Sequence, residues 1–301
     1  MTTGATEAIA AAILGLVEPG DEVVLLEPYY DSYLAMIQMA GGVRRPVTLR
    51  APDFRLDVDA LRAAVSDRTR LILLNSPHNP TGTVLTRAEL EVVAAVAIEH
   101  DLLVVTDEVY EHLTYGPEHV PIATLPGMFE RTLTLSSIGK SFSVTGWKVG
   151  WASGPPHLVQ ALLSAKQWLT FTSGAPLQPA AAYALDEAAD WPRQLAADLR
   201  GRRDLLCDGL RDVGFDVTVP EGTYFVTTDI TALGWADGTT FCRALPARAG
   251  VVAIPLEGFY EPTRPAEDRP GRHLVRWAFC KRPEVLREAL SRLADADLSA
   301  G

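Results

Sequence analysis

Residues 101–108 read DLLVVTDE, an apolar run that ends in two acids. A short apolar run without polar alternation is typical of a strand buried on both faces. Similar runs stand at 21–28 (DEVVLLEP) and 70–77 (RLILLNSP), and an alternating apolar run stands at 131–137 (RTLTLSS). Helical patterns such as 4–17 (GATEAIAAAILGLV) alternate with these strands. This alternation predicts an α/β fold: a three-layer αβα domain around a mostly parallel sheet.

Thr86 and Glu89 have the spacing of a capping box, which predicts that a helix starts after the run at 70–77. Past about residue 190 the pattern changes, and Asp190 can cap a long helix that starts at Pro192. Shorter strand candidates follow: FDVTV (215–219), TYFVTTD (223–229), GVVAIP (250–255) and HLVRWAF (273–279). We therefore expect a large domain over 1–190 and a smaller C-terminal α+β domain over 191–301.

The segment 255–273, PLEGFYEPTRPAEDRPGRH, is rich in proline, glycine and charge, which predicts a long loop. The chain has 301 residues, 48% of them hydrophobic, and a net charge of −11. This composition is typical of a globular enzyme and argues against a nucleic-acid-binding surface. No run approaches 18 apolar residues, so we expect no membrane span. Three widely spaced cysteines predict reduced thiols in a cytoplasm, and six histidines without metal-ligand spacing predict no metal site.

Unusual polar residues recur where the predicted strands end. Open α/β sheets bind ligands beyond the carboxyl ends of their strands. Each residue alone has an ordinary explanation, since Asn-Pro-Thr-Gly at 79–82 is a good turn and Asp107 could cap a helix. As a set, they have the groups needed to bind a charged planar heterocycle. The set comprises Tyr30, Asn79, Asp107, Tyr110, Ser137 and Lys140.

Lys140 has three readings: a phosphate-binding lysine, an amine nucleophile, or a surface residue in a turn. A Walker A loop needs glycine at position 134, which is Thr134, so the P-loop reading fails. The start TTGATEAI lacks the later glycines of a dinucleotide-binding turn. Its small residues at a helix N-terminus, Ala5 and Thr6, still predict backbone N–H groups that face a phosphate.

These motifs resemble the class I/II, fold-type I aminotransferases, which depend on pyridoxal 5'-phosphate. The resemblance rests on Asn79-Pro80-Thr81-Gly82, on Asp107-Glu108-Val109-Tyr110, and on Ser137-Ile138-Gly139-Lys140 with Lys148, and it runs to HLVRWAF at 273–279. EPYYDSY, NSPHNPTG, TDEVYEHL and SFSVTGWKVGW are similar to bacterial N-succinyldiaminopimelate and kynurenine-type aminotransferases.

The resemblance implies that Lys140 forms a Schiff base with the cofactor aldehyde and then moves the proton between the substrate Cα and the cofactor C4′. Asp107 would pair with the pyridine nitrogen and keep it protonated. Tyr110 and Asn79 would hydrogen-bond the phenolic oxygen of the ring, and Tyr30 would stack on the ring face.

By the same resemblance, the phosphate would lie at Ala5 and Thr6, with Ser137 and Lys148 completing its site. Many relatives have arginine where this chain has Lys148, but a lysine ammonium also binds phosphate. Arg276 would hold the substrate α-carboxylate in a two-point contact, for which a guanidinium has the right geometry.

The resemblance further implies an amino acid and a 2-oxo acid as substrates, with glutamate and 2-oxoglutarate as one pair, and a homodimer. Relatives carry a substantial segment before the TTGATEAI turn, so we expect that segment to be missing here and apolar surface to be exposed near the first helix. Three alternatives stay open: a β-lyase or decarboxylase with the same cofactor, a cofactor-binding regulator, and an inactive fragment.

Overall fold

The computed structural model describes residues 1–172 and 174–300, and its larger sheet has six strands in the order β2-β1-β3-β4-β5-β6. Every neighbouring pair is parallel except β5 and β6, which are antiparallel. The strands are β1 (Glu22–Glu27), β2 (Val43–Thr48), β3 (Thr69–Asn75), β4 (Leu103–Asp107), β5 (Thr132–Ser137) and β6 (Gly150–Ser153). The predicted α/β fold with a mostly parallel sheet is confirmed.

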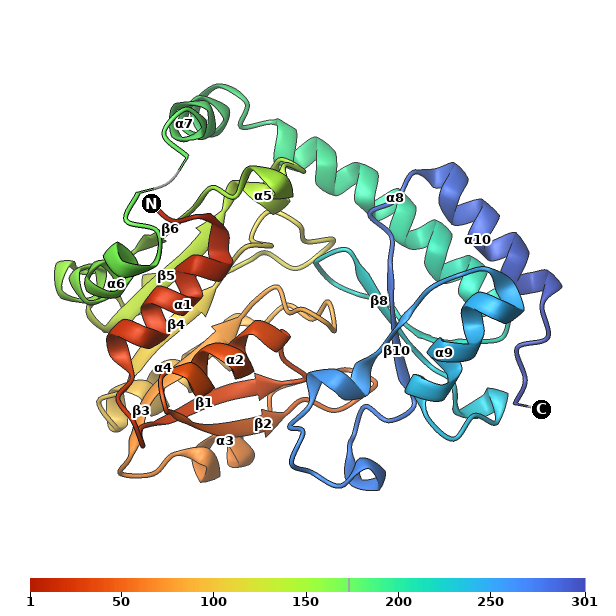
Figure 1. Cartoon of the computed structure of the whole chain (residues 1–301), viewed down its shortest axis with the longest axis horizontal. Helices are drawn as coiled ribbons and strands as arrows, with labels where there is room; N and C mark the ends of the chain where they lie inside the picture. Colours follow the sequence, from red (N-terminus) through yellow and green to blue (C-terminus); the bar gives the residue numbers. More distant parts are fainter. Residues whose placement is uncertain (173, 301) are drawn as a thin grey trace.

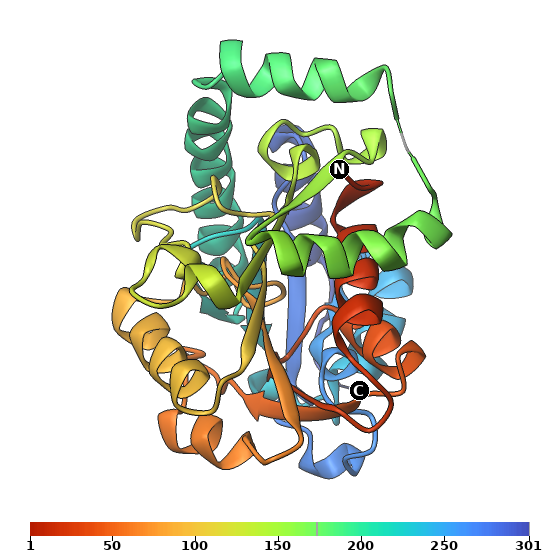
Figure 2. The ribbon, with the colours of Figure 1, turned by 90° about the vertical axis from the view of Figure 1, so that its left-hand side faces the viewer.

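Helices cover both faces of this sheet, as the prediction of buried strands requires (Figure 2). In β1, Val23 and Leu25 enter one core, while Val24 and Leu26 enter the other, because alternate side chains of a strand point to opposite faces. The first core lies under α1 (Gly4–Leu16), α2 (Asp31–Met39) and α6 (Pro156–Leu169). The second lies under α3 (Val58–Ala64) and α4 (Arg87–Glu99).

A smaller antiparallel sheet forms the second domain, with the strand order β7-β8-β10-β9 (Figure 1). Leucines of its long helices, such as Leu199, Leu206 and Leu286, pack into one core with the sheet. The elements are β7 (Asp216–Thr218), β8 (Phe225–Asp229), β9 (Ile254–Pro255), β10 (Leu274–Ala278), α8 (Trp191–Asp212), α9 (Gly238–Ala249) and α10 (Pro283–Asp295).

The four predicted strands of the large sheet correspond to β1, β3, β4 and β5, whereas β2 and β6 were not predicted. Both missed strands lie at the edges of the sheet. β2 reads VRRPVT and buries only one residue fully, and β6 has four residues. Edge strands of this kind lack the continuous apolar run on which strand prediction depends.

The capping box at Thr86 and Glu89 is present, but the expected cap of α8 is not. The helix begins at Trp191, and the side chain of Asp190 makes no capping hydrogen bond. Asp190 instead forms an ion pair with Arg193 on the first turn, because its helical backbone conformation does not aim the carboxylate at the free N–H groups.

The expected loop at 255–273 contains two short 3₁₀ helices, η5 (Leu256–Phe259) and η6 (Ala266–Asp268). Charged residues fasten it to the large sheet. Glu261 accepts two hydrogen bonds from Arg44, over 2.9 and 3.0 Å, and Arg264 pairs with the buried Glu27 over 2.6 Å. The charges that marked this segment as a loop therefore tie it to the strands.

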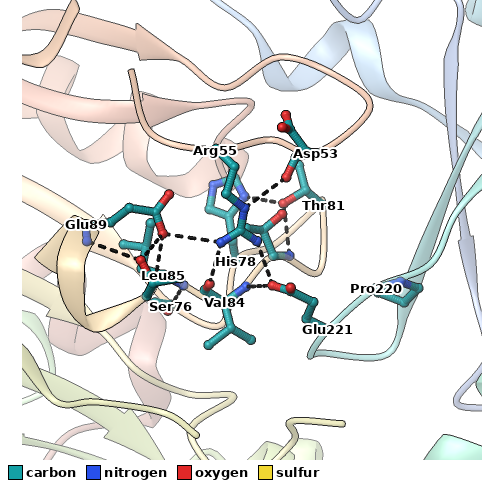
Figure 3. A network of polar contacts seen from close by, with 12 residues as sticks. Asp53, Arg55, Ser76, His78, Thr81, Val84, Leu85, Glu89, Pro220 and Glu221 are labelled. Carbon is teal, nitrogen blue, oxygen red and sulfur yellow. Dashed lines mark hydrogen bonds and ion pairs between the residues drawn. The ribbon is translucent and has the colours of Figure 1, made fainter. Parts of the chain in front are cut away.

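A polar network joins the two sheets beside the predicted Asn-Pro-Thr-Gly turn (Figure 3). Arg55 lies at its centre, within 3.2 Å of a Glu89 carboxylate oxygen and 2.6 Å of one from Glu221. The backbone N–H groups of Glu221 and Gly222 both donate to the carbonyl oxygen of Gly82, over 3.0 and 2.7 Å. The segment that leads into β8 is thus fixed against the turn after β3.

No helix within residues 1–172 and 174–300 is both long and apolar enough to span a bilayer. The same residues hold no cluster of three or more histidine, cysteine or acidic side chains arranged to bind a metal ion.

Candidate active site

A cavity of ≈ 260 Å³ lies beyond the carboxyl ends of β3, β4 and β5, and residues at the start of β8 and in β10 form part of its wall. This is where ligands bind in open α/β sheets. All ten residues singled out in the sequence line it: Ala5, Thr6, Tyr30, Asn79, Asp107, Tyr110, Ser137, Lys140, Lys148 and Arg276.

Asp107 ends β4 and is buried, with 4% of its surface exposed. The hydroxyl of Tyr33 donates to its Oδ2 over 2.7 Å, and the backbone N–H of Val109 donates to its Oδ1 over 3.3 Å. Burial raises the pKa of the Asp107 carboxyl to about 6, and these hydrogen bonds offset only part of that effect. A cationic N–H group beside the carboxylate would remove the remaining penalty.

Lys140 lies in α5 (Ile138–Ser141), a single helical turn that follows β5 directly. The sequence did not predict this short helix. The Nζ atom of Lys140 donates a hydrogen bond to the hydroxyl of Tyr224 over 2.8 Å. It also lies 5.5 Å from the ring centre of Tyr110, so its amine is directed into the cavity between two aromatic rings.

Arg276 in β10 places its guanidinium between the rings of Phe225 and Phe259, at 4.1 and 4.8 Å from their centres. One guanidinium nitrogen, Nη1, donates to Oδ1 of Asn79 over 2.9 Å. Asn79 is itself held by Asn75, whose Oδ1 accepts the Asn79 backbone N–H over 2.8 Å. The two rings hold the guanidinium plane in place, which suits two-point recognition of a carboxylate.

The N-terminus of α1 lies beside the Lys148 ammonium. Gly4 opens the helix with φ +75°, and a Cβ atom there would come within 3.3 Å of Lys148 Cε. Ser137, Ala5 and Thr6 line the same cavity. A helix N-terminus, an ammonium and a hydroxyl together form a site for an anion of phosphate size.

Two contact-making residues of the cavity were missed in the sequence: Tyr33 and Tyr224. Tyr33 stands one helical turn after Tyr30, at the spacing that puts both residues on one face of α2, and this signal was available. Tyr224 gave no such signal, because its hydroxyl reaches Lys140 only through the contact between the two sheets.

The sequence profile of the family described as aminotransferase class I and II matches residues 1–293. The chain belongs to this family. This aminotransferase is 51% identical over 301 residues to a probable N-succinyldiaminopimelate aminotransferase of Mycobacterium tuberculosis, covering 98% of this chain and 76% of that protein. It is 37% identical to a kynurenine–oxoglutarate transaminase of Dictyostelium discoideum, covering 96% of this chain and 74% of that protein.

The structure of the N-succinyldiaminopimelate aminotransferase from Mycobacterium tuberculosis is also similar. Its TM-score is 0.93 at 52% identity, covering 97% of this chain and 76% of that one. The predicted fold type and family are therefore confirmed, and the chain is a transaminase of amino and 2-oxo acids.

Class I and II aminotransferases use pyridoxal 5'-phosphate, and the cavity suits that cofactor. Burial raises the pKa of the Asp107 carboxyl, and a protonated pyridine nitrogen beside it would stabilise the charged form. The N-terminus of α1 and Lys148 suit the phosphate, Lys140 supplies an amine, and tyrosine rings flank the space between them.

Proposed function

We propose that Lys140, Asp107, Tyr110 and Arg276 carry out the amino transfer of this aminotransferase. The observation that supports this is their arrangement: an amine, a buried carboxyl, a tyrosine and a guanidinium open into one cavity. The assignment of a role to each residue rests on this geometry and on the chemistry of each group.

When bound, pyridoxal phosphate draws electron density away from the substrate Cα and so makes the α-hydrogen acidic. Asp107 would hold the pyridine nitrogen in its protonated form, while Asn79 and Tyr110 would hydrogen-bond the ring oxygen and Tyr30 would contact the ring face. Ala5, Thr6, Ser137 and Lys148 would hold the phosphate.

Lys140 would act as the acid–base group of the reaction. As a neutral amine, Nζ would take the α-hydrogen as a proton. As an ammonium, it would return a proton to the cofactor C4′. Arg276 would hold the substrate α-carboxylate and so fix which face of Cα meets the amine. Asn79 would keep the guanidinium in position through its 2.9 Å contact.

We propose glutamate and 2-oxoglutarate as one substrate pair and N-succinyldiaminopimelate as the donor of the other. The support is similarity: 51% identity to the probable N-succinyldiaminopimelate aminotransferase, and 37% to an enzyme named for kynurenine and oxoglutarate.

The test is the absorption spectrum of the purified chain with pyridoxal phosphate, before and after addition of glutamate. We expect a yellow absorption band that glutamate bleaches, and glutamate formation when 2-oxoglutarate is supplied with N-succinyldiaminopimelate. Lys140→Ala should lose both, while Lys281→Ala, which changes an exposed lysine outside the cavity, should keep them. Normal turnover in Lys140→Ala would refute the assigned role.

Kynurenine in place of N-succinyldiaminopimelate tests the donor. If glutamate forms faster with kynurenine than with N-succinyldiaminopimelate, kynurenine is the better donor and the proposed donor is wrong. Pyruvate release from a cysteine conjugate, without amino transfer to 2-oxoglutarate, would favour the β-lyase.

We also propose that the chain acts as a homodimer in the cytoplasm. Large apolar side chains are exposed along α6 and around α7 (Leu177–Glu187): Leu163, Trp168, Phe171, Tyr183 and Leu185. Exposed apolar surface of this kind marks interfaces between proteins. Light scattering on the purified chain should give twice the chain mass, and Trp168→Ser should shift it toward the monomer. A wild-type monomer would contradict the proposal.

The proposed domain boundary lies between residues 190 and 191, just before α8. The main support is that most buried apolar residues between 199 and 298 share a core with the smaller sheet, whereas β1 to β5 contribute to two other cores. The cores meet at the domain contact, where Leu256, Tyr260 and Leu274 pack into a core of the larger sheet. Limited proteolysis should cut close to this boundary. A first cut inside either sheet would contradict it.

A further inference from the structure

The free amine of Lys140 has a specific partner, the hydroxyl of Tyr224. The two atoms are 2.8 Å apart, and Nζ lies 5.4 Å from the centre of the Tyr224 ring. Tyr224 directly precedes β8 of the smaller sheet, whereas Lys140 follows β5 of the larger one. A residue from the second domain therefore touches the atom to which the proposed function assigns proton transfer.

The backbone holds Tyr224 rigidly in this place. Its carbonyl oxygen accepts the N–H of Phe279 over 3.0 Å, and the N–H of the preceding residue, Thr223, donates to Leu113 over 2.9 Å. The hydroxyl of Tyr115 donates to the carbonyl of Thr223. Thr223 has φ +64°, a conformation that a β-branched residue keeps only when its surroundings enforce it.

Tyr224 also connects Lys140 to Tyr110. The rings of Tyr110 and Tyr224 meet edge to face, with centres 5.3 Å apart and an interplanar angle of 83°. Burial raises the pKa of Tyr110 well above its ordinary value, and hydrogen bonding with Tyr224 adds to this shift. Tyr110 is therefore a neutral hydroxyl at working pH, and Tyr224 contacts both Tyr110 and the amine.

Building on the proposed function, we propose that Tyr224 is a catalytic residue. Its hydroxyl accepts a hydrogen bond from the Lys140 amine and so directs the amine toward the substrate α-hydrogen. Phenylalanine at this position would keep the ring contacts and lose the hydroxyl, which contacts both Lys140 and Tyr110. The hydroxyl is thus the part of Tyr224 that the reaction uses.

The proton transfer shows why an acceptor here speeds the reaction. The lone pair of Lys140 Nζ forms a new N–H bond while the Cα–H bond breaks, and the electron pair of that bond stays with the substrate skeleton. Nζ changes from amine to ammonium, and Tyr224 keeps its own hydrogen throughout. A hydrogen bond from an ammonium is stronger than one from a neutral amine, so Tyr224 stabilises the transition state more than the starting state.

The first test compares the wild-type holoenzyme with Tyr224→Phe in steady-state assays with glutamate. Loss of a hydrogen bond to a charged group predicts a kcat about 10- to 100-fold lower. The KM for glutamate should stay within about threefold, because Arg276 and the rest of the substrate contacts remain. The kinetic isotope effect with α-deuterated glutamate should rise, since proton transfer becomes more fully rate-limiting.

The second test uses the cofactor-free protein and needs no turnover. Both proteins are treated briefly with acetic anhydride at one pH, and acetylation of Lys140 is measured by peptide mass spectrometry. In the wild type the Tyr224 hydroxyl accepts a hydrogen bond that favours the ammonium form of Lys140, which does not react with the anhydride. Lys140 should therefore react several-fold faster in Tyr224→Phe. The exposed Lys281 serves as the internal standard and should react equally in both proteins.

The matched control is Tyr115→Phe, which removes a hydroxyl that supports the same backbone segment and leaves Tyr224 intact. It should show the wild-type isotope effect and wild-type labelling of Lys140. The proposal is overturned if Tyr115→Phe reproduces the changes, because backbone displacement would then explain them. Equal labelling of Lys140 in wild type and Tyr224→Phe also overturns it.

Failure of the proposed function has its own signature. Suppose that Lys140 is acetylated more slowly in the wild type than in Tyr224→Phe, but the wild type transfers no amino group. Transamination would then be rejected, while the contact between Tyr224 and Lys140 would be confirmed. This result would overturn the catalytic role inferred for Tyr224.

Discussion

Arg276 and Asn79 stand 197 residues apart in the chain, and a 2.9 Å hydrogen bond joins their side chains. Asn79 belongs to the turn after β3 of the larger sheet, and Arg276 belongs to β10 of the smaller one. The proposed substrate-binding part of the cavity therefore forms only while the two domains are in contact. This relation makes the site sensitive to changes at the domain contact as well as to changes inside the cavity.

Arg276→Lys should weaken substrate binding strongly. A lysine keeps the charge but loses the planar fork that can bind a carboxylate at two points and contact Asn79. We expect kcat/KM for glutamate to fall about 10- to 100-fold, most of it through KM. Arg287→Lys, an exposed change outside the cavity, is the control. An unchanged KM in Arg276→Lys would remove Arg276 from the substrate site.

Asp107→Asn should stabilise the cofactor-free protein at neutral pH and weaken cofactor binding. The pKa of Asp107 is raised from 3.8 to about 6 in the folded state, so the native protein holds this proton more tightly than the unfolded chain does. The cost of the buried charge appears as pH rises from about 4 to 6, and it reaches up to about 3 kcal/mol above that range.

The measurement is urea unfolding of the cofactor-free proteins at pH 4 and pH 8. The Asp107→Asn variant should gain stability over wild type at pH 8 and show little difference at pH 4, while the exposed control Asp216→Asn should match wild type at both. Pyridoxal phosphate should raise the melting temperature of the wild type much more than that of Asp107→Asn. A variant stabilised equally by the cofactor would contradict the proposed pairing with the pyridine nitrogen.

His78 should make the protein less stable in mild acid. This side chain is buried, its Nδ1 lies 2.7 Å from the Thr81 hydroxyl, and burial lowers its pKa from 6.5 to about 3. Between these values the unfolded chain binds the proton and the native protein does not. Its contribution to stability is therefore complete above about pH 6.5 and is lost as pH falls, by up to about 1.4 kcal/mol per pH unit.

Unfolding free energies measured from pH 7 to pH 5 test this prediction for His78. In His78→Gln the unfolding free energy should fall less steeply with decreasing pH, by up to about 1.4 kcal/mol per pH unit, which corresponds to one proton. The variant should also be less stable than wild type at pH 7. The exposed His100→Gln should show the wild-type slope. A His78→Gln slope equal to that of wild type would mean that His78 is not held neutral.

Gly82→Ala should damage the contact between the two domains. Gly82 has φ +75°, and a Cβ atom there would come within 2.3 Å of Pro220 Cβ and 3.0 Å of the Gly222 carbonyl oxygen. The left-handed conformation and the overlap together predict a loss of about 2–5 kcal/mol in unfolding free energy. Chemical denaturation measures it, with Gly116→Ala as the control, because a Cβ atom at Gly116 meets no atom within 4 Å. A loss below about 1 kcal/mol would mean that the turn shifts without cost.

The prediction of the large sheet from sequence worked where the strands are buried on both faces. β1, β3 and β4 contain continuous apolar runs, because helices cover both of their faces. β5 alternates threonine and leucine and was recognised from that apolar alternation. It failed for β2 and β6, whose edge positions demand no such run. Asp190 was misassigned because capping depends on the backbone conformation at the helix start, which residue type alone does not determine.

The sequence by itself determined the fold class and the residues that line the site. Parallel strands bring their carboxyl ends to one edge, so Asn79, Asp107, Ser137 and Lys140 had to gather there once the strands were recognised. Only the tertiary structure determined which side chains hold these groups. Tyr33 on Asp107, Tyr224 on Lys140 and the phenylalanine rings around Arg276 come from distant elements. Such contacts depend on how helices and the second sheet pack onto the first, and local sequence pattern carries no information about that packing.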